Sequence, residues 1–304
     1  MATVDQLVEN IQEVIQDPTY DEDYIVDRMN RVYANIAGGI KLPEKAWGSQ
    51  VSPPLPDLLV IDNTLWSSPS LAYITMPATF QRRVDFLALV STKQRIEILN
   101  TFVALRKRYP MLDATSQIQV AAVSGRRLHY QGKPSYTVTT SSTIGFTAAT
   151  RTITDTGLGL DVSPNMVINI SGSVANDGDK TVVSVAANHG SCVVSEILVQ
   201  GAVGPSIVVT KGVNLSTHYY KYPETLALGG PGPLALSEHQ HDDLIVNGVA
   251  TYIYNLIEDG VEDPKTNTKK YGELFIEAVE SMSMAIPAEG ESMFIWPDEG
   301  QSAY

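Results

Sequence analysis

Two stretches of helical periodicity open the chain. Apolar residues recur three or four positions apart, and Thr3 with Gln6 before them has the form of a capping box. The second stretch follows an acidic start at residues 21–23, whose carboxylates suit a helix N-terminus, and the pair Gly38-Gly39 weakens it. The sequence therefore predicts an αα-hairpin. The two apolar stripes are Val4, Leu7, Val8, Ile11 and Ile15, and Ile25, Met29, Val32, Ile36 and Ile40.

Residues 41–77 carry a pattern that breaks regular structure. Prolines recur in this stretch together with Ser and Gly, and we expect them to exclude long helices and strands. The segment would then wrap over a core rather than form one. The prolines are at positions 43, 53, 54, 56, 69 and 77.

Strand-like patterns begin beyond this segment. Residues 84–90 and 95–99 predict two strands joined by a turn, and Asn100 or Thr101 then caps a short basic helix that runs to Arg108. One long helix over residues 92–108 is the alternative, because periodicity alone does not separate the two.

A hairpin is predicted next. Residues 118–123 and 127–131 flank Ser124-Gly125-Arg126, whose glycine suits a tight turn between strands. The second arm, LHYQ, stops at Gly-Lys-Pro, and a segment that resembles its continuation, LSTHYYKYPE, comes some eighty residues later. We expect residues 128–131 and 217–221 to pair as consecutive strands of one small sheet.

The residues between these two segments have a different character. Thr, Ser, Val, Ile and Gly dominate, and glycine-containing turn signals recur at short, fairly even intervals, as is typical of a small all-β sandwich or barrel. The predicted strands are residues 150–154, 166–170, 181–185, 192–199 and 207–210.

Helical periodicity returns near the C-terminus. Ser237 and Gln240 form a second capping box, residues 258–260 close the helix that follows, and a last helix comes after it. The two stripes are Ile245, Val249, Tyr252, Ile253 and Leu256, and Tyr271, Leu274, Phe275, Ala278 and Met282.

The final segment contains the apolar cluster Met293, Phe294, Ile295 and Trp296. A disordered tail rarely carries such bulky residues together, so we expect this cluster to pack against another protein surface.

Composition narrows the class of protein. The 304 residues are 43% hydrophobic and 18% charged, which is typical of a soluble globular protein. No apolar run approaches the roughly 18 residues of a membrane span, and the N-terminus lacks the features of a signal peptide, so we expect a protein made in a cytoplasm. Cys192 is the single cysteine, which excludes an intrachain disulfide and a thiolate zinc site.

The net charge is −13. A net negative charge argues against a protein that binds nucleic-acid phosphates, because such binding depends on clustered Lys and Arg. An acidic surface past which DNA slides is compatible with it. A solvated surface with no implied partner is the simpler interpretation.

Motifs of common active sites are missing from the sequence. It contains no phosphate-binding loop of the Gly-x4-Gly-Lys-Ser/Thr type, no Gly-x-Ser-x-Gly elbow and no His-Glu-x-x-His helix. The best metal candidate is residues 238–243, with His239 and His241 among carboxylates, but positions two apart on a helix point in different directions. We therefore predict no catalytic residue, no metal and no cofactor.

Two further stretches allow a functional and a structural interpretation. Residues 176–179, Asn-Asp-Gly-Asp, suggest a calcium loop but lack its spacing, so a hairpin turn is favoured. Tyr219, Tyr220 and Tyr222 suggest an aromatic binding strip, but aromatic residues are also preferred in strands, so packing is favoured.

Four segments carry a resemblance to a known family. MPATFQR at residues 76–82, GRRLHYQGKP at 125–134, HYYKYP at 218–223 and LIEDG at 256–260 resemble the head-to-tail adaptor proteins of tailed bacteriophages. The paired N-terminal helices and the late helix pair come in the same order as in that family.

The resemblance covers residues 1–133 and 215–285. In simpler members of the family, the Leu-His-Tyr-Gln strand leads within a few residues to the His-Tyr-Tyr strand. Residues 134–214 depart from that pattern, and their TITDTG and ISGSVANDG pieces resemble small β modules of other phage virion proteins.

The resemblance implies a structural role in the virion. It implies a homo-oligomeric ring, usually of twelve copies, at the head-tail junction, beneath the portal protein and above a tail or nozzle protein, assembled in the host cytoplasm. DNA would pass through the ring without sequence-specific binding, with no catalysis, no cofactor and no membrane. Because the C-terminal segment of this family often reaches the portal, Met293, Phe294, Ile295 and Trp296 are the expected partner-binding residues.

The expected fold class is α+β. Residues 1–133 and 215–285 would form an adaptor core, which is a helical bundle with a small antiparallel sheet. Residues 134–214 would form an inserted all-β domain, of sandwich or Ig-like type, and residues 286–304 an extended segment.

A rival interpretation of the function is a tail-associated binding module whose β domain recognises a host surface or carbohydrate. That rival predicts aromatic rings on the β domain, yet Tyr136 and Phe146 are the only aromatics between residues 133 and 214. A hydrolase that uses scattered carboxylates has no supporting feature beyond their abundance.

Overall fold

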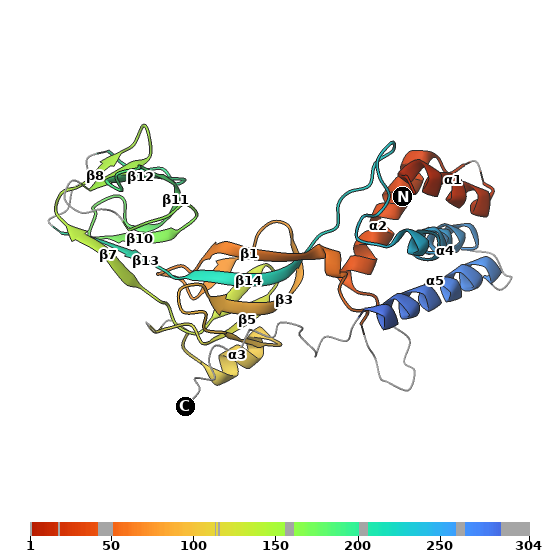
Figure 1. Ribbon diagram of the computed structural model, residues 1–304, viewed down its shortest axis with the longest axis horizontal. Coiled ribbons are helices and arrows are strands. Elements are labelled where there is room, and N and C mark those ends of the chain that lie inside the picture. The colour runs from red at the N-terminus through yellow and green to blue at the C-terminus, as the bar shows by residue number, and fades with distance from the viewer. Residues whose placement is uncertain are drawn as a thin grey trace, which may run out of the picture. The chain divides into compact units, whose positions relative to one another are not determined.

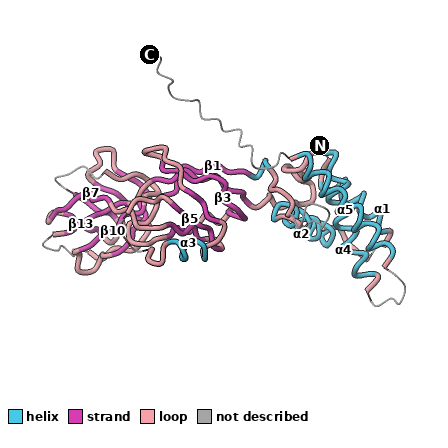
Figure 2. Tube along the Cα trace, turned by 90° about the horizontal axis from the view of Figure 1, so that it is seen from below, coloured by secondary structure: helices cyan, strands magenta, loops and turns pink. Residues whose placement is uncertain are grey.

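The computed structural model describes residues 2–17, 19–41, 51–112, 114, 116–155, 161–200, 206–259 and 265–286. The chain divides into two compact units, which we describe separately. The helical unit consists of Met1–Leu59 and Lys221–Tyr304, and the β unit of Val60–Tyr220. Five α-helices and three sheets lie in the described residues, which confirms the mixed α+β class (Figures 1 and 2).

The N-terminal helix pair forms as predicted. In the capping box of the first helix, the Thr3 amide donates to Gln6 Oε1 at 2.9 Å and the Gln6 amide donates to Thr3 Oγ1 at 3.3 Å. Asp21 caps the second helix by accepting from the Tyr24 amide at 2.8 Å. The first stripe is buried throughout, and Ile40 of the second lies beyond its helix. The helices are α1, Val4–Ile15, and α2, Glu22–Gly38.

The late helices also belong to the helical unit. A short π-helical segment, His241–Val246, leads into α4, Asn247–Ile257, and α5 spans Thr266–Ala285. α4 packs against α1, α2 and α5. Its predicted stripe is buried only in part, because Tyr252 and Leu256 are 40% and 45% exposed. On α5, Leu274 is also exposed, while Val279, which the pattern did not single out, is buried.

Two small sheets in the β unit share one core. The three-stranded sheet has the order β1-β14-β3 and the four-stranded sheet the order β2-β6-β5-β4. Leu128 and Tyr130 from one sheet and Leu215 and Tyr219 from the other belong to the same buried cluster. The strands are β1 Leu59–Trp66, β2 Tyr73–Thr75, β3 Phe80–Leu89, β4 Glu97–Leu99, β5 Val120–Ser124, β6 Arg127–Tyr130 and β14 Asn214–Lys221.

Several local predictions for this region are confirmed. β3 and β4 are strands, Thr101 caps α3, Phe102–Arg108, and β5 and β6 form a hairpin around Gly125, whose φ is +58°. The alternative of one long helix over residues 92–108 is wrong. The exclusion of long helices and strands from residues 41–77 is also wrong, because the strand β1 has eight residues. Its prolines lie on either side of the strand, so they delimit β1 without removing any of its backbone donors.

The predicted pairing of residues 128–131 with 217–221 is wrong. β6 lies between β2 and β5, and β14 lies between β1 and β3, so both edges of each strand are already paired. Since their side chains meet in a shared core, the two strands are related through packing and not through a hydrogen-bonded ladder.

The third sheet has seven antiparallel strands in the order β7-β13-β10-β11-β12-β9-β8 (Figure 1). The five predicted strands are present, although the predicted strand 192–199 ends at Val194, and β7 and β8 were not predicted. The barrel alternative is wrong, since the sheet does not close. The strands are β7 Tyr136–Ser141, β8 Ile144–Thr147, β9 Thr152–Asp155, β10 Val167–Ser171, β11 Gly178–Val185, β12 Ser191–Val194 and β13 Ile207–Lys211.

β11 links the two halves of this sheet. Its first residues pair with β10 and its last residues with β12, and the register shifts between Val182 and Ser184. Side chains from both halves, including Phe146 of β8 and Val209 of β13, are buried in one cluster. The seven strands therefore enclose a core of their own.

Candidate interaction surfaces

The sequence-predicted metal candidate has a structural role. His241 is buried, and its Nε2 lies 3.0 Å from the Pro233 carbonyl oxygen and 3.1 Å from that of Leu236. His239, by contrast, is exposed, so the two rings do not face a common point. No group of three or more His, Cys, Asp or Glu side chains suited to a metal ion occurs among the described residues.

Residues 176–179 close the hairpin between β10 and β11, in agreement with the turn interpretation: Asn176 and Asp177 precede β11, and Gly178 and Asp179 are its first residues. Asp177 accepts from the Ser173 amide at 2.7 Å, and Asn176 exchanges two hydrogen bonds with the backbone of Val199. These side chains satisfy the backbone of the turn and of the segment beside it.

Of the three tyrosines at positions 219, 220 and 222, the two on β14 pack in the interior. Tyr219 and Tyr220 are buried, and the Tyr219 ring lies 5.7 Å from that of Phe80, whereas Tyr222 is 53% exposed. The packing interpretation is confirmed for the first two.

The predicted partner-binding residues Met293, Phe294, Ile295 and Trp296 lie outside the described residues.

A polar junction joins the seven-stranded sheet to the β1–β2 connection. Asp179 of β11 accepts from the hydroxyls of Ser68 and Ser70 at 2.6 and 2.7 Å, and from the amide group of Asn169 at 2.8 Å. Ser68 is buried, and its backbone amide donates to the hydroxyl of Tyr130, itself fully buried in β6. Asp179 thus fastens the seven-stranded sheet to the two smaller sheets.

The second part of this junction is the link between β13 and β14. The Ser67 amide donates to the Val213 carbonyl at 2.9 Å, and the Val213 amide donates to Ser67 Oγ at 2.8 Å. Gly212 lies so close to this point that a Cβ atom on it would be 1.9 Å from the Ser67 carbonyl oxygen. Only glycine allows the two backbones to approach in this way.

The first part of the β unit along the sequence has an excess of positive charge. Residues 60–133 contain ten Lys and Arg against four Asp and Glu, a net of +6 in a chain whose net charge is −13. Eight of the ten basic side chains are exposed. We call these eight the basic surface: Arg83, Lys93, Arg95, Arg106, Lys107, Arg108, Arg126 and Arg127.

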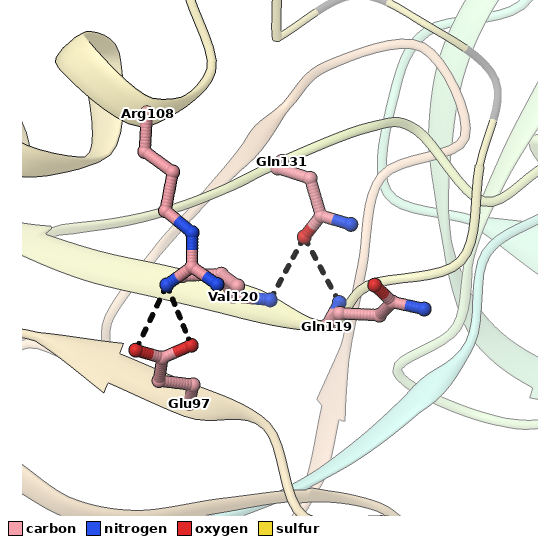
Figure 3. Close-up of polar contacts among 5 residues, drawn as sticks. All are labelled: Glu97, Arg108, Gln119, Val120 and Gln131. Atoms are coloured by element: carbon pink, nitrogen blue, oxygen red, sulfur yellow. Dashed lines mark hydrogen bonds and ion pairs between the residues drawn. The ribbon is translucent and has the colours of Figure 1, made fainter.

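α3 supplies three members of the basic surface. They occupy its last turn, where cations interact favourably with the helix dipole. Arg108 donates from Nη1 to both oxygens of Glu97, at 2.9 and 2.8 Å (Figure 3). Figure 3 also shows how β5 is held beside them: Gln131 Oε1 accepts from the amides of Gln119 and Val120 at 2.9 and 2.8 Å. α3 thus places its three basic side chains beside β4 and β5.

Negative charge gathers at the start of the helical unit. Residues 1–27 contain eight Asp and Glu and no Lys or Arg. Seven of these carboxylates are exposed. Three of the seven, Asp21, Glu22 and Asp23, border an open hollow of about 720 Å³ between α1, α2 and the residue Leu228, together with the less exposed Asp17. We call the seven the acidic surface: Asp5, Glu9, Glu13, Asp21, Glu22, Asp23 and Asp27.

Two histidines on the β unit have a perturbed protonation equilibrium. Burial, and then the nearby Arg127 guanidinium, lower the pKa of His129 below its ordinary value. Its ring lies between those of Tyr73 and Phe102, at 5.5 and 4.2 Å. Burial also lowers the pKa of His218, against a smaller opposing effect of Asp85. Both rings are therefore favoured in the neutral form.

The motif search missed the basic and acidic surfaces because neither is a motif. Counting the charges of successive segments would have distinguished the basic segment from the acidic one, whereas the net charge of −13 sums the two. Such a count does not place side chains on a surface, since Arg82 lies in the same segment and is half-buried.

Comparisons with known proteins assign no family to the chain. No protein-family model matches it, and no curated protein matches it in sequence. None of the described helices is long and apolar enough to cross a membrane.

Proposed function

We propose that this chain is a virion structural protein, a head-to-tail adaptor that forms a ring between the portal and the tail of a bacteriophage and surrounds part of the DNA channel. The observation that carries the proposal is that α1 and α2 gather with α4 and α5 in one unit. The adaptor resemblance implies the same helix pairs from the two ends of the chain. The proposed role is mechanical, with no catalysis and no cofactor.

The proposed domain organisation follows the same resemblance. Residues 1–133 and 215–285 are the adaptor core, a helical bundle with small sheets, and residues 134–214 are an inserted β domain of sandwich type. Support comes from the seven-stranded sheet, all of whose strands lie between Tyr136 and Lys211. Residues 286–304 are proposed as an extended segment.

The rival function, a module that binds a carbohydrate or host surface through the β domain, has less support than the adaptor role. Sugar rings stack on exposed aromatic side chains. Phe146 is buried in the core of the seven-stranded sheet, which leaves Tyr136, 44% exposed, as the one exposed aromatic side chain among the described residues of that domain.

Mass photometry of the purified full chain, alone and with the portal protein of the same virus, tests the proposal. A twelve-membered ring of the 33.0 kDa chain corresponds to a particle of about 400 kDa, and we expect it to appear or to be stabilised when the portal protein is present. A chain that stays monomeric and leaves the portal unbound would contradict the adaptor role.

Alanine substitutions at Phe294, Ile295 and Trp296 test the C-terminal segment. Unchanged portal binding by this variant would show that the segment is not part of the portal interface.

A further inference from the structure

The two units carry opposite net charges. Residues 60–220 contain thirteen Lys and Arg and nine Asp and Glu, a net of +4. The remaining residues contain eight and twenty-five, a net of −17. Charge of one sign raises the free energy of a surface through self-repulsion, and an oppositely charged partner relieves it.

The acidic surface has little compensation within its own unit. Arg28 and Arg31 both lie near Asp27, but no basic residue precedes them in the sequence. Glu9 and Glu13 are exposed one turn apart on α1, a spacing at which like charges destabilise a helix. Neither forms an ion pair with a described residue.

The basic surface is compensated only in part by carboxylates among the described residues. Within the described part of residues 60–133, Glu97 is the one exposed carboxylate, and both its oxygens accept from Arg108. Asp85, which is less exposed, is paired with Arg83. The neighbouring Arg106 and Lys107 are thus exposed cations on α3 without a carboxylate partner among the described residues.

We propose that the acidic surface of one copy binds the basic surface of the next copy. This inference rests on the proposed ring. Each copy carries one surface of each sign, so the contact is heterologous, and a series of such contacts closes into a ring when the rotation between copies allows it. Complementary charge also steers encounter and fixes the register of the two surfaces.

Duplex DNA is the competing occupant of the basic surface. A second copy is favoured because the acidic surface is present at the same concentration as the basic one and in equal number. The helical unit, with its net charge of −17, also repels DNA from the same molecule.

The test uses the full chain and mass photometry. We expect Arg106→Glu with Lys107→Glu, and separately Glu9→Lys with Glu13→Lys, to raise the concentration at which the ring half-assembles by about tenfold or more. The chain with all four substitutions should assemble at close to the original concentration, because the charges are exchanged and the contact is restored. Recovery of assembly would show that the double variants fail because the contact is lost and not because they misfold. Far-ultraviolet circular dichroism checks the fold of every variant.

A matched control places the same change of charge elsewhere. Lys269→Glu with Lys270→Glu reverses two cations on α5 and should leave assembly unchanged. Raising NaCl from about 0.1 to 1 M shortens the Debye length from about 10 to about 3 Å and should weaken the original ring, though not abolish its apolar contacts.

Three results distinguish the possible failures. A chain that is monomeric at every salt concentration, with or without portal, would refute the adaptor ring itself. Rings that form but respond to neither charge reversal nor salt would refute only the paired surfaces. If Arg106→Glu with Lys107→Glu left assembly intact but abolished binding of a fluorescent 30-base-pair duplex, DNA would be the occupant and the inference would be overturned.

Discussion

Tyr136, the first residue of β7, lies opposite Lys211, the last residue of β13, in antiparallel register. The chain therefore enters and leaves the seven-stranded sheet at the same point. The two residues after Lys211 lead directly into β14, so the two covalent connections between the sheet and the rest of the chain lie side by side. This is the arrangement that tolerates insertion of one domain into another.

Removal of the seven-stranded sheet should leave a folded protein. In a variant that lacks residues 136–211, with Ser135 joined to Gly212 through a short Gly-Ser linker, we expect a soluble product with the helical circular dichroism of the original and a cooperative melting transition. Trp66, which packs against the removed core, becomes exposed, so we also expect some loss of stability. An aggregated product, or one with no melting transition, would contradict the insertion.

Gly212→Ala should destabilise the junction between β13 and β14. The added methyl group would overlap the Ser67 carbonyl oxygen, and we expect a loss of about 1–3 kcal/mol in the free energy of unfolding, measured by urea titration. Gly272→Ala is the matched control. Its Cβ would be 3.6 Å from the nearest atom, inside helix α5, so that substitution should stabilise by up to about 1 kcal/mol.

Asp179→Ala should loosen the attachment of the seven-stranded sheet. The hydroxyls of Ser68 and Ser70 lose their shared acceptor, and Ser68 is buried, so we expect a cost of about 1–3 kcal/mol. Faster amide hydrogen exchange in β11 would localise the effect. For comparison, Asp161→Ala removes a carboxylate whose side chain is 83% exposed and should change stability by less than about 1 kcal/mol. Equal effects of the two substitutions would contradict the role of Asp179.

His129 should make the β unit less stable in mild acid. Its pKa is lowered in the folded state, so below the ordinary value of about 6.5 the unfolded chain binds more protons than the folded one. Stability is therefore full above that value and falls as pH decreases through it. We expect His129→Phe, which keeps an aromatic ring between Tyr73 and Phe102, to lose less in melting temperature between pH 7 and pH 5 than the original chain. An unchanged pH dependence would show that His129 does not contribute to it.

Local structure followed closely from the sequence. The caps of α1, α2 and α3 and the β5–β6 hairpin are encoded within a few consecutive residues, so their side-chain and turn chemistry was visible without knowledge of the fold. β1 was missed for the opposite reason. Its proline-rich flanks concealed a strand that forms because β14 offers it an edge.

The sequence by itself determined the helix pairs, the β character of residues 134–214 and the excess of acidic residues. Only the tertiary structure decided which strands pair: β6 and β14 share a core but not a ladder, because strand pairing depends on which edges remain open after the whole chain has packed. Tertiary structure also decided the surfaces. Basic side chains of β3, of the β3–β4 connection, of α3 and of the β5–β6 turn remained exposed to solvent, whereas apolar residues of the same segments were buried.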